Sequence, residues 1–426
     1  MNHSIQSRLK RRTLRPGKQR QLTVVDLFSG AGGTGVGFKK AGFRIVGAVE
    51  INRNAAKTYE NNLKVKVKRE DINRISPAAL CREFKLRPRQ LDVLVGCPPC
   101  QGFSRMRNKE GHKDPRNKLV LQYLEFVKAF MPRFAVFENV PGLVRTKHGK
   151  EFYEALYAGL QELGYKVKQR EDDVADYGVP QHRRRIIVIA GRDGETPPFP
   201  IPTYGDPKSP NVLNGKLKRW LTVRDAIGQG QYPELEAGEN GEGKPTRLYP
   251  NHVAPKMSEK VLNFIRRVPH DGGSRGQMQE IYWLDCHKAH DGHKDVYGRL
   301  AWDSPSNTIT CGCTNVSKGR FVHPSQDRAL TPREAATLQG FDDKFIFEAD
   351  AAGSQIGNAV PPPYALAIAK AIRKKILAFE PQRRRRTPYV QDITRTGAGR
   401  GGISSGRNLI VFPERGRRRP ALARAA

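Results

Sequence analysis

The sequence is poor in cysteine and in long apolar runs, and each shortage excludes a class of protein. Six cysteines in 426 residues, at positions 81, 97, 100, 286, 311 and 313, are too few and too unevenly spaced for the disulfide framework of a secreted protein. No apolar run approaches the length of a membrane span, and no apolar stretch follows the basic residues 1–20 as it would in a signal peptide. We therefore expect a soluble, cytoplasmic protein with no membrane partner.

Acidic residues are also scarce relative to basic ones, with 42 Asp and Glu against 75 Lys and Arg, which gives a net charge of +33. Residues 1–20 hold seven basic residues and no acid, and residues 381–426 hold twelve arginines against two acids. These tails carry only about half of the excess, so the body of the chain is basic as well. A polyanion is the natural partner, because binding to phosphates releases counterions. A basic surface that serves only solubility is the alternative.

The first half of the chain alternates short apolar runs with helical stretches, which predicts an α/β fold with a doubly wound, mostly parallel sheet. The expected helices include 34–41, 118–131 and 363–378. The expected strands are Thr23–Phe28, Arg44–Val49, Val65–Lys68, Leu91–Gly96, Phe134–Phe137, Tyr165–Gln169 and Arg185–Ala190.

A change in amino-acid composition near Asp193 predicts a second, smaller and more irregular domain. Proline and glycine crowd residues 197–215 and 228–245, and the strand–helix rhythm stops there. Since one core seldom serves more than roughly 250–300 residues, two lobes are expected. We expect a first lobe built from 21–193 and 301–380, a second from 194–300, and basic tails at 1–20 and 381–426.

A glycine-rich turn follows the first expected strand in the string VVDLFSGAGGTGVGF. Gly30 and Gly32 lie between a strand and a helix, where missing side chains let a ligand approach the backbone. Glu50 ends the second strand at the spacing of an acid that binds ribose hydroxyls, and Asp71 ends the third as a candidate for the adenine edge. A dinucleotide, S-adenosylmethionine and a purely structural tight turn all remain open at this point.

The string CPPCQGFS follows the fourth expected strand and places Cys100 on a loop stiffened by two prolines. A stiff loop positions a nucleophile well. The competing interpretation is metal or redox chemistry, since Cys97 and Cys100 have C-x-x-C spacing. A zinc site would need two more ligands, and the other close pair, Cys311 with Cys313, has C-x-C spacing.

Six strings in order carry a resemblance to a known family: DLFSGAGGTGVGF, GCPPCQGFS, FENV, QHRRR, TPREAATLQGF and QIGNAVPPPYA. The chain resembles the bacterial cytosine-5 DNA methyltransferases over residues 23–370. The resemblance implies a Rossmann-like methyltransferase fold, S-adenosylmethionine as methyl donor, no metal, and a cytosine flipped out of double-stranded DNA. It assigns the covalent attack to Cys100 and a structural role to Cys97.

The same resemblance implies the remaining site residues. Glu138 in FENV would bind the cytosine ring, and Arg183 and Arg185 of QHRRR would face the active site while Arg184 points outward. An N-cap for the following turn is the alternative role of Glu138. Residues 194–300 would form the target-recognition domain, with Gln101, Ser104 and Arg275 as DNA contacts. The expected cofactor contacts are Phe28, Ser29, Gly30, Gly32, Glu50, Asp71, Ile72, Pro98, Asn358 and Val360.

The expected partners are double-stranded DNA and a restriction endonuclease that acts on the same site, and we expect the protein to be a monomer. Two alternatives keep the fold: a tRNA cytosine-5 methyltransferase, and a catalytically inactive DNA-binding relative. The Gly102–Phe103–Ser104 string favours DNA over tRNA, and the intact Cys100 and Glu138 argue against inactivity. A dehydrogenase is a further alternative, but this sequence contains no set of residues suited to hydride transfer.

Overall fold

The structure is a computed structural model that describes residues 20–99, 114–228, 230, 232–235, 249–288 and 295–386. The predicted site residues Cys100, Gln101 and Ser104 lie outside the described residues. Residues Met1–Glu380 form one compact unit, and Pro381–Ala426 form the other. Within the described ranges, no helix combines the length and the apolar composition that crossing a membrane requires.

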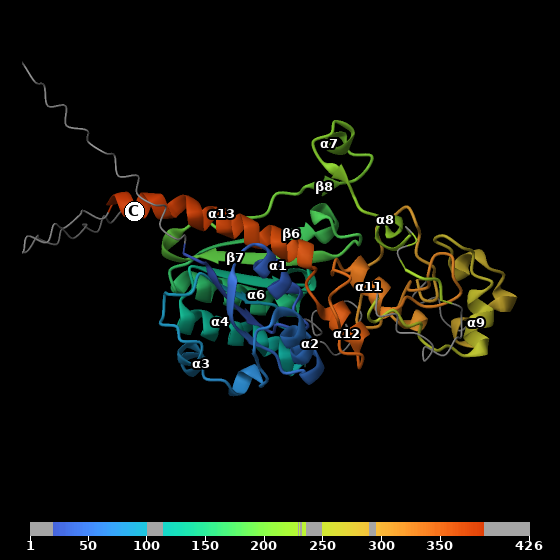
Figure 1. Cartoon of the computed structure of the whole chain (residues 1–426), viewed down its shortest axis with the longest axis horizontal. Coiled ribbons are helices and arrows are strands. Elements are labelled where there is room, and N and C mark those ends of the chain that lie inside the picture. The colour runs from blue at the N-terminus through green and yellow to red at the C-terminus, as the bar shows by residue number, and fades with distance from the viewer. Residues whose placement is uncertain are drawn as a thin grey trace, which may run out of the picture. The chain divides into compact units, whose positions relative to one another are not determined.

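The main sheet of the Met1–Glu380 unit has seven strands in the order β3-β2-β1-β4-β5-β7-β6 (Figure 1). The first five of these strands are parallel, and β7 runs antiparallel to both β5 and β6. The predicted doubly wound, mostly parallel sheet is therefore confirmed. The strands are β1 (Thr23–Leu27), β2 (Arg44–Val49), β3 (Val67–Lys68), β4 (Val93–Gly96), β5 (Phe134–Asn139), β6 (Lys166–Asp173) and β7 (Arg184–Gly191).

Helices cover both faces of this sheet, which explains why β1 and β5 are buried along their whole length. Neighbouring residues of β1 point to opposite faces, so Val24 joins one apolar cluster and Val25 the other. The first cluster receives α1 (Gly33–Lys40), α2 (Arg53–Leu63) and α13 (Pro362–Arg386). The second cluster receives α3 (Pro77–Glu83), α4 (Leu119–Phe130) and α6 (Lys147–Glu162), and α5 (Gly142–Arg145) precedes α6.

Strand β6 extends to Asp173, four residues beyond the predicted end at Gln169. The prediction followed the apolar residues, whereas Arg170–Asp173 are charged. These residues pair with Arg184–Ile187 in the antiparallel register of β6 and β7, so backbone hydrogen bonding continues the strand where apolar composition stops.

The C-terminal part of the chain returns to the first lobe beside the glycine turn. A Cβ atom on Gly33 would lie 2.1 Å from the carbonyl oxygen of Val360, and one on Gly37 would lie 2.5 Å from the Cβ of Ala365. Only glycine allows α1 and the start of α13 to approach so closely. Helix α11 (Pro332–Leu338) begins with a reciprocal capping box between Thr331 and Glu334, and α12 (Ala352–Asn358) follows.

Among the described residues between 194 and 330, regular structure is sparse. The segment contains β8 (Tyr204–Gly205), α7 (Pro210–Leu213), β9 (Lys218–Arg219), α8 (Val223–Ile227), α9 (Glu259–Ile265) and α10 (Asp285–Lys288). Apolar side chains of α8 pack with those of α11 and α12 in a third cluster, and Ile265 of α9 belongs to a fourth. Hydrophobic periodicity predicted few helices or strands here, because the segment consists mainly of long loops held by small apolar clusters.

Candidate functional site

The glycine turn after β1 leaves open space at Gly30. This residue has a φ of 53°, and a Cβ atom built on it would meet no described atom within 4 Å. Gly32 has a φ of 105° and is the N-cap of α1. The neighbouring Ser29 is buried, and its hydroxyl has no hydrogen-bond partner among the described residues. A buried polar atom beside empty space is a feature of a binding site.

Glu50 at the end of β2 is tied directly to this turn. Its carboxylate accepts hydrogen bonds from the backbone N–H groups of Gly30 and Asn52, both at 2.8 Å. Burial raises the pKa of Glu50, while these backbone hydrogen bonds oppose the increase. The structure therefore brings the predicted ribose-binding acid and the glycine turn together.

The residues that follow β3 form a more distant part of the same edge of the sheet. Asp71 caps the short 3₁₀ helix Ile72–Arg74 by accepting hydrogen bonds from the backbone and side chain of Asn73, each at 3.0 Å. Ile72 is buried, and Phe28, with a φ of 55°, packs against the same apolar cluster. These contacts hold the predicted Asp71, Ile72 and Phe28 beyond the ends of β1 and β3.

Ile51 is a candidate cofactor contact that the sequence analysis missed. It directly follows Glu50, yet its side chain is 67% exposed, unusual for a large aliphatic residue beside a sheet. An exposed apolar side chain at this position could pack against the flat face of an adenine ring. The available signal was an isoleucine immediately after the acid that ends β2.

The loop after β4 begins with a cysteine whose surroundings disfavour ionisation. Burial raises the pKa of Cys97 well above its usual value, and the nearby carboxylates of Glu138 and Asp26 raise it further. Since the thiolate is the reactive form of cysteine, Cys97 is a poor nucleophile here. The next residue, Pro98, is buried and accepts a hydrogen bond at 3.3 Å from the side chain of Asn139, which ties this loop to the end of β5.

The end of β5 also carries the most informative pair of the site. Glu138 Oε1 lies 2.9 Å from Nε of Arg185 on the neighbouring β7, and their side chains are only 10% and 12% exposed. This Glu138 oxygen accepts no well-directed hydrogen bond from any described group. The carboxylate is therefore buried, balanced by one positive charge, and still able to bind a ligand. An N-cap role would not require this arginine.

The three arginines of QHRRR take different positions. Arg184 is 67% exposed and points outward, whereas Arg185 meets Glu138. Arg183 is buried and donates hydrogen bonds to the carbonyl oxygens of Ile309 at 2.9 Å and Gly357 at 3.0 Å. Arg183 precedes the first residue of β7, so the alternation of side chains along that strand does not determine where the Arg183 side chain points. The structure thus brings Arg185 to Glu138 and engages Arg183 with the returning C-terminal segment.

The returning segment places Asn358 and Val360 differently. Val360 is buried against the glycine turn, as its contact with Gly33 shows, while Asn358 is exposed. The Asn358 side-chain oxygen accepts a hydrogen bond at 3.0 Å from the thiol of Cys311, and the buried Cys313 thiol contacts the carbonyl of Gly353. The described residues contain no group of three or more His, Cys, Asp or Glu arranged to hold a metal ion.

Arg275 differs from the expectation of a surface contact to DNA. Only 3% of the residue is exposed, and its guanidinium carbon lies 5.3 Å from the ring centre of Trp283. The Trp283 indole N–H donates to the Arg275 carbonyl at 3.0 Å. In this arrangement the Arg275 guanidinium lies against Trp283, and its contact with DNA stays a prediction.

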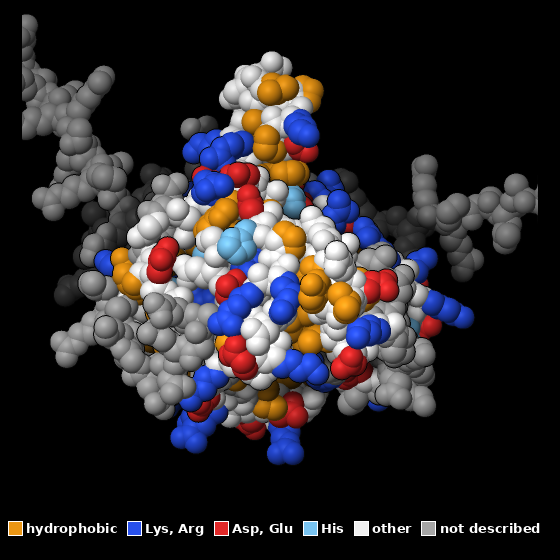
Figure 2. All heavy atoms as spheres, turned by 90° about the vertical axis from the view of Figure 1, so that its right-hand side faces the viewer, with side chains coloured by type: hydrophobic (Ala, Val, Ile, Leu, Met, Phe, Trp, Pro, Cys, Tyr) orange, Lys and Arg blue, Asp and Glu red, His pale blue; other side chains and the backbone are white. Residues whose placement is uncertain are grey.

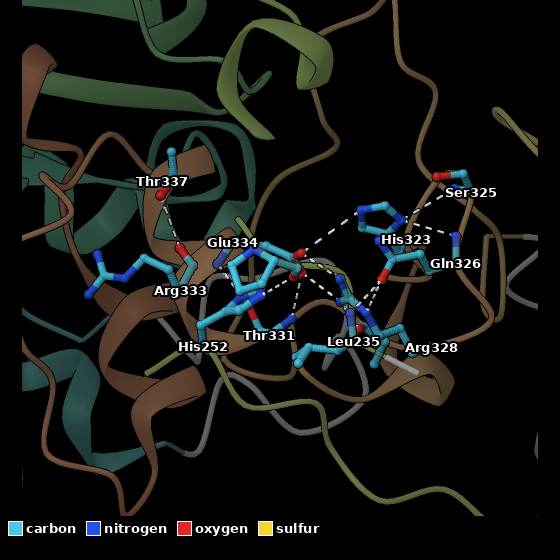
Figure 3. A network of polar contacts seen from close by, with 12 residues as sticks. Leu235, His252, His323, Ser325, Gln326, Arg328, Thr331, Arg333, Glu334 and Thr337 are labelled. Carbon is cyan, nitrogen blue, oxygen red and sulfur yellow. Dashed lines mark hydrogen bonds and ion pairs between the residues drawn. The ribbon is translucent and has the colours of Figure 1, made fainter. Parts of the chain in front are cut away.

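A buried polar network joins α11 to the irregular region (Figure 3). Arg328 donates two hydrogen bonds to Glu334, at 2.6 and 2.8 Å, and both side chains are almost fully buried. Burial alone would raise the pKa of Glu334, but the charge and hydrogen bonds of Arg328 outweigh it and lower the pKa to about 2. His323 and His252 complete the network, which fixes the loops that lead away from the first lobe.

Comparisons with known proteins show the family to which the sequence belongs. The sequence profile described as C-5 cytosine-specific DNA methylase matches residues 22–374. The Type II methyltransferase M1.HphI of Haemophilus parahaemolyticus is 38% identical over 83% of this chain and 87% of its own length. The Type II methylase M.HgiDII of Herpetosiphon aurantiacus is 31% identical over 82% of this chain and 95% of its own length.

Solved structures support the fold independently. A prophage-encoded Escherichia coli protein described as a DNA modification methyltransferase is similar with a TM-score of 0.63 at 24% identity, covering 84% of this chain and all of its own. The Entamoeba histolytica methyltransferase EhMeth gives a TM-score of 0.52 at 18% identity, covering 84% of this chain and 99% of its own. With the sequence match over most of its length, the chain belongs to the C-5 cytosine-specific DNA methylase family.

Proposed function

We propose that this protein transfers a methyl group from S-adenosylmethionine to carbon 5 of cytosine in double-stranded DNA, with Cys100 as a covalent nucleophile. The observation that carries the proposal is the buried Glu138–Arg185 pair, with its 2.9 Å separation, at the edge where the glycine turn and the Pro98 loop also lie. A carboxylate with this surrounding can bind the ring nitrogen and amine of a cytosine. Family membership, the order of the motifs and this geometry support the same reaction.

The residues at the glycine turn fit S-adenosylmethionine. Gly30 leaves room for a ligand against the backbone, and the Ser29 hydroxyl is buried without a partner in the described chain. Glu50 is positioned as an acceptor for ribose hydroxyls, and Ile51 offers an apolar surface to a base. When bound, this cofactor supplies an electrophilic methyl group on a positively charged sulfur.

Cys100 and Glu138 have different roles in the reaction. The Cys100 thiolate forms a bond to carbon 6 of the ring, and the electrons of the 5,6 double bond make carbon 5 nucleophilic. Glu138 shares a proton with the ring nitrogen and so balances the charge that develops there. After carbon 5 has taken the methyl group, loss of its proton and departure of the thiolate restore the ring. The Cys97 thiol takes no part.

Arg185 acts on Glu138 and on the reacting base from β7. Its guanidinium compensates the buried carboxylate and adds positive potential, which favours the thiolate form of a nearby cysteine. Residues 194–300 are proposed to bind the DNA around the flipped cytosine, since a base in a duplex must leave the stack before its ring can be attacked. We further propose that the protein works in the cytoplasm as a monomer, beside a restriction endonuclease that acts on the same site.

The test is expression in a host that lacks DNA methylation, followed by sequencing of the host DNA for 5-methylcytosine. We expect methylation at one recurring sequence with the wild type and none with Cys100→Ser. A 5-methylcytosine mark in tRNA with none in DNA would contradict the proposed substrate. Full activity of the Cys100→Ser protein would contradict the proposed nucleophile.

A further inference from the structure

The segment 201–220, called here the 201–220 projection, stands out from the Met1–Glu380 unit next to the candidate active site. It contains β8, α7 and β9, and the projection at the top of Figure 1 is seen again at the top of Figure 2. Strands β8 and β9 pair in parallel, and the turn between them is closed by hydrogen bonds from Lys216 and Leu217 to the carbonyl of Asn211. The projection is therefore a folded structure with a defined surface.

Its base is fixed to the edge of the sheet that holds Glu138 and Arg185. The 3₁₀ helix Val174–Tyr177 continues from the end of β6 at that edge. The backbone N–H of Thr203 donates to the carbonyl of Asp176 at 3.0 Å, and the indole N–H of Trp220 donates to the Asp176 carboxylate at 2.8 Å. The ring of Trp220 also packs edge-on against His182, the residue before Arg183, at 4.8 Å between ring centres.

The surface of the projection is basic, and its charges are not neutralised within the described chain. It has four basic residues and one acid, Asp206. Arg219 pairs with Asp225, but no carboxylate of the described residues lies within ion-pair distance of the exposed Lys208, Lys216 or Lys218. The two carboxylates at the base are both engaged, Asp173 by His182 and Asp176 by Trp220. In Figure 2 the projection is mainly white and orange, with blue side chains on its flank and at its base.

We propose that, within the DNA-binding region 194–300, the 201–220 projection holds the duplex by its phosphates, and that Lys208, Lys216 and Lys218 bind the phosphate backbone beside the cytosine site. This inference rests on the proposed function, because it assumes that DNA reaches this edge. Exposed lysines without carboxylate partners break no ion pair when they bind phosphate, and each neutralised phosphate releases counterions from the DNA. Phosphate binding carries no sequence information and instead fixes the position of the duplex.

The experiment compares two triple variants in DNA binding. The test variant is Lys208→Gln, Lys216→Gln and Lys218→Gln. The control variant, Lys40→Gln, Lys128→Gln and Lys166→Gln, removes the same charge from exposed lysines at the ends of α1 and α4 and the start of β6, on the opposite edge of the sheet. Binding of a labelled duplex is followed by fluorescence anisotropy from 50 to 200 mM salt, with thermal unfolding as a check on folding.

The test variant is expected to reduce the slope of log Kd against log salt concentration by about 2–3, close to 0.9 for each phosphate that the lysines no longer neutralise. The control variant should retain the wild-type slope. Equal slopes for the two variants would overturn the proposal, as would a change seen with tRNA and not with duplex DNA. A single Lys216→Glu variant, on an exposed turn, should weaken binding in the same direction and keeps the test decisive if the triple variant folds poorly.

The outcome is separable from that of the proposed function. Methylation of host DNA by the wild type tests the reaction, whereas the slope difference tests only this surface. Methylation without a slope difference would support the proposed reaction and contradict a role of the projection in DNA binding. A slope difference without methylation would support the DNA-binding surface and contradict the proposed reaction.

Discussion

Arg185 Nε lies 2.9 Å from Glu138 Oε1 across adjacent strands, with both side chains largely buried. The two residues are 47 positions apart in the sequence but come together because Glu138 pairs with Ile187 in the β5–β7 register. Residues two apart on a strand share a face, so Arg185 projects on the same side as Ile187 and reaches the carboxylate. This pair links the predicted catalytic acid to a positive charge on the neighbouring strand.

Replacement of Arg185 by alanine should lower kcat for DNA methylation by about 10²–10³, because a preorganised charge next to the reacting base is removed. Binding of S-adenosylmethionine, measured by calorimetry, should be unchanged. The neighbouring exposed Arg184 is the matched control, and Arg184→Ala should change kcat less than about threefold, as surface substitutions usually have small effects. An equal decrease in both variants would argue against the specific role of Arg185.

A duplex that carries 5-fluorocytosine at the target position should form a stable covalent complex with the wild type. Fluorine cannot leave carbon 5 as a proton does, so the thiolate stays attached after methyl transfer. Denaturing electrophoresis and mass spectrometry should locate the adduct on Cys100. The Cys97→Ser protein should still form it and Cys100→Ser should not; an adduct on Cys97 would reverse the assignment.

The open space at Gly30 predicts that a single methyl group there blocks the cofactor. Gly30→Ala should weaken S-adenosylmethionine binding at least tenfold in calorimetry. Gly164 is a close control, since it also has a positive φ, 81°, and would place a Cβ in open space. Both alanine substitutions should cost about 1–3 kcal/mol of stability through backbone strain. Weaker cofactor binding in Gly164→Ala as well would show that strain, and not occupancy of the site, is responsible.

Arg328 and Glu334 form a buried ion pair whose disruption should be costly. Arg328→Met leaves the Glu334 carboxylate buried without its main partner, which should reduce the free energy of unfolding by about 3–5 kcal/mol. Urea unfolding at pH 7 measures this change. The exposed Arg224–Asp303 pair provides the comparison, and Arg224→Met should shift the urea midpoint far less than Arg328→Met does. Similar costs for the two variants would contradict the importance of burial.

His323 should make the protein less stable as the pH falls below 6.5. Burial lowers the pKa of His323 to about 4, so the unfolded chain binds this proton before the folded one does. The stabilisation is therefore complete above pH 6.5 and declines as the pH falls towards 4, by at most about 3 kcal/mol. Urea midpoints from pH 7 to pH 4.5 should fall less steeply for His323→Asn than for the exposed-site control His270→Asn. Parallel curves would exclude His323 as a source of the pH dependence.

The sequence predicted the sheet well because its strands are buried on both faces and appear as continuous apolar runs. It failed at the end of β6, where Arg170–Asp173 are charged and only the pairing with β7 makes them a strand. It could not show that Arg275, predicted as a DNA contact, is buried against Trp283, since a sequence shows that an arginine is present but not what covers it. Ile51 was overlooked because exposure of an apolar residue is a property of the fold.

The sequence by itself determined the family and the glycine turn and predicted the reacting groups, because each depends on residue types at short spacing along the chain. Only the tertiary structure decided that Arg185 meets Glu138, that Arg183 turns to Ile309 and Gly357, and that the 201–220 projection lies beside the site. Those relationships join positions far apart in the chain. Strand register and helix packing set them, and neither can be read from local sequence.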